Sequence, residues 1–201
     1  MSWIRMVALA SCAALLSGCL SPPRATTPVK HLQFTGPDGK TWVWPADKVK
    51  EAQGKCDVGD ARTCFLLALA FGEGPLAFAY YEKACEGGVA DGCKGAALLH
   101  REGKGGVLAN QKEGIRFLVR ACDEGEARAC ADVSQAYFTG QQMPQDRTKA
   151  LDYARRACDG GHAERCRFVG LTYYLGEAGI AKDANTTADV FRRQTRWPHV
   201  I

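Results

Sequence analysis

Four pairs of cysteines, each pair eight positions apart, impose a repeat on most of this chain. The pairs are Cys56 and Cys64, Cys85 and Cys93, Cys122 and Cys130, and Cys158 and Cys166. In every copy, a glycine lies three residues after the first cysteine and an alanine lies five residues after it. A further glycine lies ten residues after each second cysteine, at Gly74, Gly103, Gly140 and Gly176. Repeats of this period build arrays in which each unit folds like its neighbours.

The repeating unit predicts two antiparallel helices. The glycine after each first cysteine is expected to end one helix in the left-handed conformation, and the next helix carries the second cysteine in its first turn. Asn110 and Asp146, each twelve residues before a first cysteine, are expected to be helix N-caps. The first cysteines are 29, 37 and 36 residues apart, so one unit has lost a loop. There we expect Pro75 to begin a helix directly after Gly74.

Side chains of similar size recur in register. Four residues after each second cysteine come the small residues Ala68, Ala97, Ser134 and Gly170, where we expect neighbouring helices to approach closely. Three residues further on come Phe71, His100, Tyr137 and Tyr173. Five residues before the later first cysteines come Tyr80, Phe117 and Tyr153. A ring or ring-like side chain therefore recurs in every unit.

The last unit differs from the others. Asp183 is a candidate N-cap for a helix over residues 185–197, which Pro198 would end. Thr195 stands where a cysteine would complete the pattern. A cysteine there would have no later helix to join, so we expect this helix to be a terminal cap.

The cysteine spacing favours four disulfides, each between the two members of a pair. The last turn of one helix and the first turn of the next should bring the Cα atoms to roughly 5–6 Å. Each bridge closes a short ring and is worth about 2–3 kcal/mol by loop entropy. Zinc is the competing interpretation, but zinc sites prefer cysteines two to four apart, and no unit supplies a histidine pair. Redox chemistry would favour Cys-x-x-Cys, which is absent from the sequence.

The N-terminus predicts export. Residues 1–18 combine one basic residue, Arg5, with an apolar run from Val7 to Leu16, as in a secretory signal peptide. The run ends in Leu-Ser-Gly followed by Cys19, which resembles a bacterial lipobox and implies cleavage before Cys19 and acylation of its thiol. Cys12 would leave with the leader. Leu20 rather than aspartate after Cys19 favours the outer membrane, on its periplasmic or surface side.

Two short segments separate Cys19 from the repeats. Residues 19–30, rich in proline and threonine, are expected to be a flexible tether. Residues 31–44 place turn-forming Gly-Pro-Asp-Gly between two β-prone stretches and predict a hairpin that caps the array. Trp42 and Trp44 would share one face of it. They would either pack on the first helix, expected over 46–56, or form an exposed ligand platform.

The repeat pattern over residues 46–197 resembles that of Sel-one-like repeat (SLR) proteins, in the cysteine-rich Hcp type. The resemblance implies an all-α fold: a right-handed, tetratricopeptide-like α/α solenoid of about four helix pairs over residues 45–201, stapled by disulfides. SLR proteins are in general adaptors that gather partners on a concave face. The resemblance therefore implies a secreted, lipid-anchored scaffold that binds a protein or peptide. The alternative it implies is a β-lactam-binding or weakly hydrolysing enzyme, because some relatives of the Hcp type carry that label.

The residues themselves favour binding over catalysis. After Cys19 the serines are Ser21 and Ser134, and no lysine follows Ser134 by three positions as Ser-x-x-Lys enzymes require. The histidines are scattered singly, so no metal site or other cofactor is predicted. His100 occupies a ring position of the repeat, as a packing residue or, alternatively, a ligand or base. Glu73, Glu102 and Glu177 adjoin repeat glycines and would be solvated helix ends or line one edge.

A binding groove is the positive prediction. Side chains expected on the exposed faces of the helices after the second cysteines are Lys94, Arg128, Asp132, Gln135, Arg165, Arg167 and Thr172. Residues 101–201 hold 16 basic and 13 acidic residues, so a groove there would be mixed to mildly basic and would suit an acidic peptide or an anionic wall polymer. These residues would otherwise be ordinary solvated charges. The net charge of +4 is too small to predict nucleic-acid binding.

Overall fold

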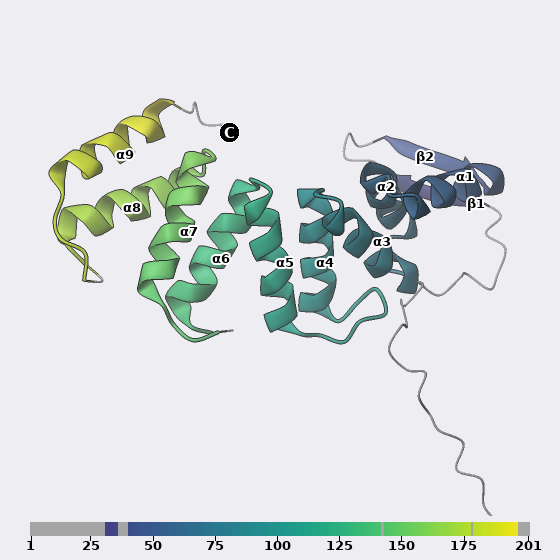
Figure 1. The fold of residues 1–201 in the computed structure, drawn as a ribbon, viewed down its shortest axis with the longest axis horizontal. Coiled ribbons are helices and arrows are strands. Elements are labelled where there is room, and N and C mark those ends of the chain that lie inside the picture. Colours follow the sequence, from purple (N-terminus) through teal and green to yellow (C-terminus); the bar gives the residue numbers. More distant parts are fainter. Residues whose placement is uncertain (1–30, 36–39, 142, 178, 197–201) are drawn as a thin grey trace, which may run out of the picture.

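A computed structural model describes residues 31–35, 40–141, 143–177 and 179–196 of the chain. Over these residues a two-stranded hairpin precedes nine helices that follow one another in a single elongated, curved row (Figure 1). The strands are β1 (His31–Thr35) and β2 (Thr41–Pro45). The helices are α1 (Ala46–Asp57), α2 (Ala61–Phe71), α3 (Pro75–Glu86), α4 (Ala90–Glu102), α5 (Gln111–Asp123), α6 (Ala127–Thr139), α7 (Arg147–Asp159), α8 (Ala163–Leu175) and α9 (Ala184–Arg196).

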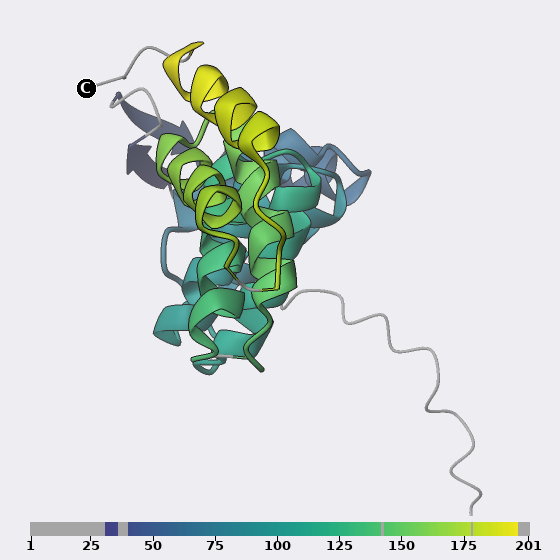
Figure 2. The ribbon, with the colours of Figure 1, turned by 90° about the vertical axis from the view of Figure 1, so that its left-hand side faces the viewer.

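Consecutive helices pack in pairs, so the predicted all-α solenoid is confirmed. The four pairs are α2 with α3, α4 with α5, α6 with α7, and α8 with α9. The hairpin and α1 lie at one end of the row, and α9 lies at the other (Figure 1). In the view along the row, the units lie stacked one behind another (Figure 2). This is expected when each unit contacts mainly its neighbours.

The tight corner between units is a Schellman turn in all four copies. The glycine three residues after each first cysteine has a positive φ, between 81° at Gly88 and 99° at Gly59. The N–H of the following residue then reaches back five positions, as Val89 does to the carbonyl of Ala84 at 2.9 Å. This conformation favours glycine because it has no Cβ. The predicted helix ends are confirmed.

The first helix of each unit also ends at a glycine. In three of the four units this is the repeat glycine ten residues after the second cysteine. Gly103, Gly140 and Gly176 end α4, α6 and α8 in the left-handed conformation. In the short first unit this role passes to Gly72, and Gly74 instead becomes the N-cap of α3. Pro75 is the first residue of that helix, as predicted from the missing loop.

The predicted N-caps are present. The side chains of Asn110 and Asp146 accept hydrogen bonds from the backbone N–H three residues on, at 3.2 Å and 2.9 Å. Asp183 likewise accepts from Thr186 N at 3.1 Å and begins α9. A cap of this kind satisfies a backbone donor that the first turn of a helix leaves unpaired.

Four disulfides staple the row: Cys56–Cys64 joins α1 to the first unit, and Cys85–Cys93, Cys122–Cys130 and Cys158–Cys166 each join one unit to the next. Their Cα–Cα distances of 4.5 to 4.9 Å are shorter than the 5–6 Å expected, because the two helices meet at a tight corner. All eight cysteines are buried. The disulfide-stapled solenoid is thus confirmed, and each bond links a helix to the first helix of the unit that follows it.

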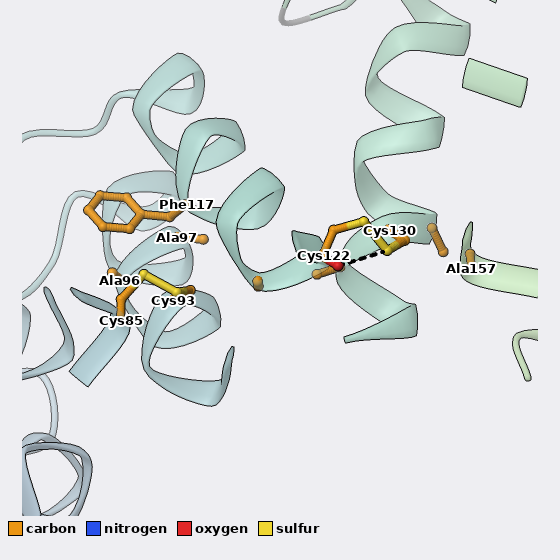
Figure 3. Close-up of a cluster of buried hydrophobic side chains, with 11 residues drawn as sticks. Cys85, Cys93, Ala96, Ala97, Phe117, Cys122, Cys130 and Ala157 are labelled. Carbon is orange, nitrogen blue, oxygen red and sulfur yellow. Dashed lines mark hydrogen bonds between the residues drawn. A yellow bond between two sulfur atoms is a disulfide. The ribbon is translucent and has the colours of Figure 1, made fainter. Parts of the chain in front are cut away.

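The hydrophobic core is divided along the row. The first cluster consists of buried side chains from α1, α2 and α3. The second takes its side chains from α3 to α7, and the third from α7, α8 and α9. Figure 3 shows the second cluster, with Phe117 and Ala97 near the Cys85–Cys93 bond and Ala157 beside Cys130. The dashed line there joins Cys130 Sγ to Cys122 O at 3.6 Å, a contact without a shared proton because a disulfide sulfur carries none.

The repeated small residues lie where helices cross closely. Ser134 is fully buried, and its Oγ donates to the carbonyl of Ala150 in α7 at 2.8 Å. One unit earlier, a Cβ added to Gly114 would lie 3.1 Å from Ala97 O, so a side chain there would press α5 away from α4. The predicted close approach is confirmed in both units.

The recurring rings stack in pairs within the first three units. Phe71 stacks on Tyr80 with ring centroids 5.4 Å apart, and Tyr137 stacks on Tyr153 at 5.7 Å. The last unit has Tyr173 in the first position but Val190 in the second, and both are buried in the third cluster. The pairs therefore join the two helices of a unit face to face.

The hairpin pairs in antiparallel register, with Leu32 opposite Trp44 and Phe34 opposite Trp42. The side chain of Trp44 packs on the first core cluster. This supports packing, rather than a ligand platform, for that tryptophan. The predicted turn over residues 36–39 and the side chain of Trp42 lie outside the described residues, as do the leader, Cys19, the tether and Pro198. No helix in the described part of the chain is long and apolar enough to cross a membrane.

Candidate functional site: a groove between α4 and α6

A groove of about 420 Å³ runs between α4 and α6, with α5 beneath it. Four of the predicted groove residues line it: Lys94, Arg128, Asp132 and Gln135. We call this surface the α4–α6 groove. It lies on the face formed by the first helix of each unit, which is where the sequence placed a binding surface.

The floor of the α4–α6 groove is apolar. Leu98 of α4 contributes a side chain that is 42% exposed, and Ile115 and Leu118 contribute from α5. Gly114 brings the backbone of α5 close to α4 at this point. An apolar floor with polar groups on its walls is the usual character of a site that takes part of another molecule.

The groove is open because a ring is missing. Between α2 and α4 the corresponding space is filled by Tyr81, whose ring lies over Gly95. Between α6 and α8 it is occupied by Phe168, which packs against Phe138 with centroids 5.4 Å apart. Between α4 and α6, Leu118 of α5 stands in place of the ring of Tyr81, and Asp132 of α6 stands in place of the ring of Phe168. Neither side chain fills the space, so a gap remains between α4 and α6.

Positive charge dominates the walls. Lys94 is held by Asp91 at 2.9 Å and lies 3.6 Å from Glu126. Arg101 lies 3.8 Å from Glu102, and its side chain is 63% exposed. Arg128 has no carboxylate at ion-pair distance anywhere in the described residues. The groove therefore presents cations whose charge is only partly compensated.

Asp132 is the one carboxylate in the groove lining that the structure describes. Asp132 is exposed to solvent, but the surrounding protein partly desolvates its carboxyl and raises its pKa, while the charges of Arg101 and Arg165 oppose that shift. An aspartate in this position is easier to protonate than one in water, because its charged form has lost hydration. A single carboxylate faces three cations in this lining, Lys94, Arg101 and Arg128, so it offsets only part of their positive charge.

Arg165 extends the groove towards the next unit. It does not line the gap itself, but its Nη2 donates to Gln135 Oε1 at 2.9 Å across the α6–α8 interface. Its Nε is buried and has no hydrogen-bond partner among the described residues. Arg165 thus joins the groove to the surface around Phe168, over whose ring its guanidinium lies at 6.0 Å.

Besides Arg165, two more of the residues predicted for the groove do not line it. Arg167 is exposed on α8 but does not contact the gap between α4 and α6. The prediction that Thr172 is exposed is wrong, because its side chain is buried and its Oγ1 donates to the carbonyl of Phe168 at 2.9 Å. A threonine can turn its hydroxyl to the carbonyl one turn back in its own helix, and helical spacing alone does not reveal this.

The candidates for catalysis are held by packing. The fully buried hydroxyl of Ser134 is engaged with Ala150 and faces no solvent, so it cannot attack an external substrate. His100 lies between rings, edge-on to Phe78 at 4.9 Å and stacked on Phe117 at 5.7 Å. Its buried Nδ1 has no hydrogen-bond partner in the described chain. His100 is therefore placed as a ring of the repeat.

The glutamates next to repeat glycines are surface groups. Lys104 bridges Glu73 at 2.7 Å and Glu102 at 3.1 Å, so this pair lies together and is charge-compensated. Glu177 lies apart from them, beside Phe168. Among the described residues, no group of three histidines, cysteines or carboxylates is arranged to hold a metal ion.

The sequence missed Arg101, Leu98 and the residues that α5 contributes to the groove. One signal was available in the repeat register. The position two residues after the second cysteine is occupied by Leu66, Gly95, Asp132 and Phe168 in turn. A charged residue at this position, Asp132, marks the place where the array is open. It leaves a gap only because the neighbouring side chain in α5, Leu118, is also too short to fill the space.

Comparison with known proteins agrees with this architecture. The Sel1 repeat family model matches residues 61–89, 90–126 and 127–162, which together make up half of the chain. Cytochrome c oxidase assembly factor 7A of Xenopus laevis and factor 7 of Xenopus tropicalis are each 30% identical over 71 residues. That stretch is 35% of this chain and 31% of each relative, so the match spans about a third of the relatives' length.

Solved structures with the same fold include c5321, a protective antigen of uropathogenic Escherichia coli with an SLR fold. Its TM-score is 0.58 at 15% identity, covering 74% of this chain and 33% of that one. A Sel1 repeat protein from Oxalobacter formigenes gives 0.54 at 20% identity, covering 74% and 69%. Helicobacter pylori cysteine rich protein B gives 0.48 at 19% identity, covering 61% and 92%. With three matched repeats and the same helix-pair architecture, the chain belongs to the Sel1 repeat family.

Proposed function

We propose that this protein is a scaffold of the bacterial envelope that binds a protein or peptide partner in the α4–α6 groove. The observation that carries the proposal is the interruption of the ring pattern, which leaves a gap of about 420 Å³ between α4 and α6. A gap with an apolar floor and only partly compensated cations offers both burial and electrostatic attraction to a partner.

The family supports this proposal. Sel1 repeat scaffolds typically act in protein–protein interaction, and the curated relatives carry the name of assembly factors. The four disulfides indicate an oxidising compartment outside the cytoplasm, where such bonds form and persist. The β-lactam alternative stays a prediction, and the position of Ser134 gives it no support.

The proposal includes a lipid anchor. In it, residues 1–18 are the leader, Cys19 is acylated, residues 19–30 are the tether, residues 31–44 cap the array, and residues 45–201 form the solenoid. Two or three acyl chains hold a protein on a membrane durably. The tether would then present the α4–α6 groove to partners beside the outer membrane.

Site-specific crosslinking in intact cells tests the binding site. A photoreactive phenylalanine is placed at Leu98 in the groove or, as a control, at Leu108, which is 89% exposed in a loop. We expect a discrete adduct from the Leu98 position that disappears when Arg101→Glu and Arg128→Glu are added. The same adducts from both positions, or none from Leu98, would refute the groove as the binding site.

A further inference from the structure

An exposed apolar surface continues from the α4–α6 groove onto α8. Tyr174 is 64% exposed, Leu175 is 47% exposed and Leu171 is 44% exposed. They lie three and four positions apart, so they share one face of the helix. With Phe138 and Phe168 they form what we call the α8 strip. Phe168, Leu171 and Leu175 follow the i, i+3, i+7 spacing of one helix face, unlike the singly scattered apolar side chains of an ordinary surface.

The groove and the α8 strip are joined by direct contacts. Arg165 donates to Gln135 in the wall of the groove and covers the ring of Phe168 in the strip. Phe138 packs on Phe168 and immediately precedes Thr139, which lines the groove. A single ligand that crosses α6 would therefore meet the charged groove and the apolar strip in succession.

The walls of the groove match a peptide backbone. Gln111, Gln135 and Gln141 line it. The amides of Gln111 and Gln141 offer both a donor and an acceptor, and Gln135, whose Oε1 already accepts from Arg165, offers its NH2 donor. A peptide in extended conformation presents N–H and C=O groups along its length, so amides can satisfy either one. The uncompensated charge of Arg128, with Arg101 beside it, selects a negatively charged side chain on the peptide.

The spacing of the helices sets the spacing of the ligand. Packed helices are about 8–10 Å apart, and an extended chain advances about 3.3 Å per residue. The width of one helix therefore matches roughly three residues of an extended peptide. The distance from the groove to the outer face of α8 matches about three to six residues.

We propose that the ligand is an extended acidic peptide segment. Its carboxylate lies on Arg101 and Arg128, and its apolar or aromatic side chain lies on the α8 strip, about three to six residues along the peptide. This inference rests on the proposed function and names the chemistry of the partner. Neither the groove cations nor the α8 strip alone is expected to bind the peptide tightly, because exposed ion pairs and exposed apolar contacts are each weak.

The test uses fluorescein-labelled peptides in a glycine–serine background and the full-length protein, exported so that its disulfides form and kept in detergent. One peptide carries two glutamates, followed four residues later by a leucine and a phenylalanine. A second has the reverse order. Matched peptides replace glutamate by glutamine or lysine, or the apolar pair by serine. Binding is followed by fluorescence anisotropy at low and high salt.

We expect one order of the acidic peptide to bind at least about tenfold more tightly than its glutamine and serine counterparts, with binding weakened by salt. Arg101→Glu with Arg128→Glu should abolish the preference for glutamate. Tyr174→Ser with Leu171→Ser should abolish the preference for the apolar pair. The matched controls, Lys50→Glu on α1 and Leu108→Ser in a loop, should change neither preference.

Equal binding of the glutamate and glutamine peptides, or tighter binding of the lysine peptide, would overturn the inference. So would binding of an anionic polysaccharide such as polygalacturonate with no binding of any peptide. If no peptide binds but crosslinking at Leu98 in cells still yields a groove-dependent adduct, the proposed function survives and the acidic, extended ligand is rejected.

Discussion

Arg156 of α7 reaches back to Asp123 of α5, with Nη2 2.8 Å from Oδ1, and so ties one unit to the unit before it. The same nitrogen donates to the carbonyl of Cys122 at 2.9 Å. Equivalent contacts recur along the row: Lys83 with Asp57 at 2.7 Å and Arg193 with Asp159 at 2.7 Å. Each cation lies two residues before a first-cysteine position, and each aspartate directly follows the first cysteine of the previous unit.

Arg156→Gln should lower the free energy of unfolding by about 1–2 kcal/mol, since it removes a charged hydrogen bond and an exposed ion pair. Thermal unfolding should show a decrease in Tm of a few degrees. Arg116→Gln is the control, because among the described residues Arg116 forms an ion pair with Glu113 of its own helix alone. Equal losses in the two variants would show that the contact between units adds no stability.

Cys122→Ala with Cys130→Ala should destabilise the protein by about 2–3 kcal/mol, from the loop entropy of a nine-residue ring. This bond lies in the middle of the row, within the largest core cluster. Its loss should therefore affect units on both sides, whereas removal of Cys56–Cys64 should affect only the end. Hydrogen exchange resolved by residue would show the difference, and identical exchange in the two variants would contradict it.

His100→Phe should raise Tm and stabilise the protein by about 1 kcal/mol, because it replaces a ring with an unpaired buried nitrogen by one without. His100→Ala should have the opposite effect, since it removes the ring that stacks on Phe117. A loss of stability in His100→Phe would mean that the imidazole makes a needed polar contact.

Asp132→Asn should raise Tm at pH 7. The pKa of Asp132 is raised by burial, so the folded protein holds a proton on this carboxyl more readily than the unfolded chain does. The ionised carboxylate therefore destabilises the fold above its folded-state pKa, and this cost disappears as pH falls towards the ordinary value of 3.8. The advantage of Asp132→Asn should vanish over the same range.

Asp152→Asn is the control for this measurement, because Asp152 is an exposed aspartate that pairs with Arg155 on its own helix. It should show no gain at pH 7. If Asp132→Asn lowers Tm at neutral pH, the attraction of Arg101 and Arg165 for the carboxylate outweighs its desolvation. Asp132→Asn should also strengthen binding of the acidic peptide, since it removes a negative charge from the groove.

Cys19→Ser should release the protein from the membrane fraction and abolish incorporation of labelled palmitate. Cys12→Ser is a matched control in the same leader, and it should leave both unchanged. Cell fractionation with immunoblotting provides the measurement. Membrane retention of Cys19→Ser would contradict the lipid anchor.

Features that depend on one unit could be predicted from the repeat. The corner glycines, the caps at Asn110 and Asp146, and the start of α3 at Pro75 follow from local backbone preferences, which the sequence states directly. The small residues at helix crossings followed in the same way, because one register position serves every unit.

The groove depends on two helices at once and could not be located in the same way. Asp132 stands out only beside Phe168 in the next unit, and it leaves a gap only because Leu118 in α5 is shorter than Tyr81 in α3. The prediction that Thr172 is exposed was wrong for a different reason, because its hydroxyl donates to a backbone carbonyl of its own helix. Pairings between helices and choices of rotamer are set by packing, which a periodic pattern does not encode.

The position of the disulfides has a consequence for how such arrays change in length. Every covalent ring closes over a tight corner, and the connections over residues 103–110, 140–146 and 176–183 lie outside all four rings. A recombination event within one of these connections inserts or removes a whole helix pair together with both cysteines of a ring. Each remaining cysteine keeps its partner, so the chain can be lengthened or shortened without oxidative mispairing.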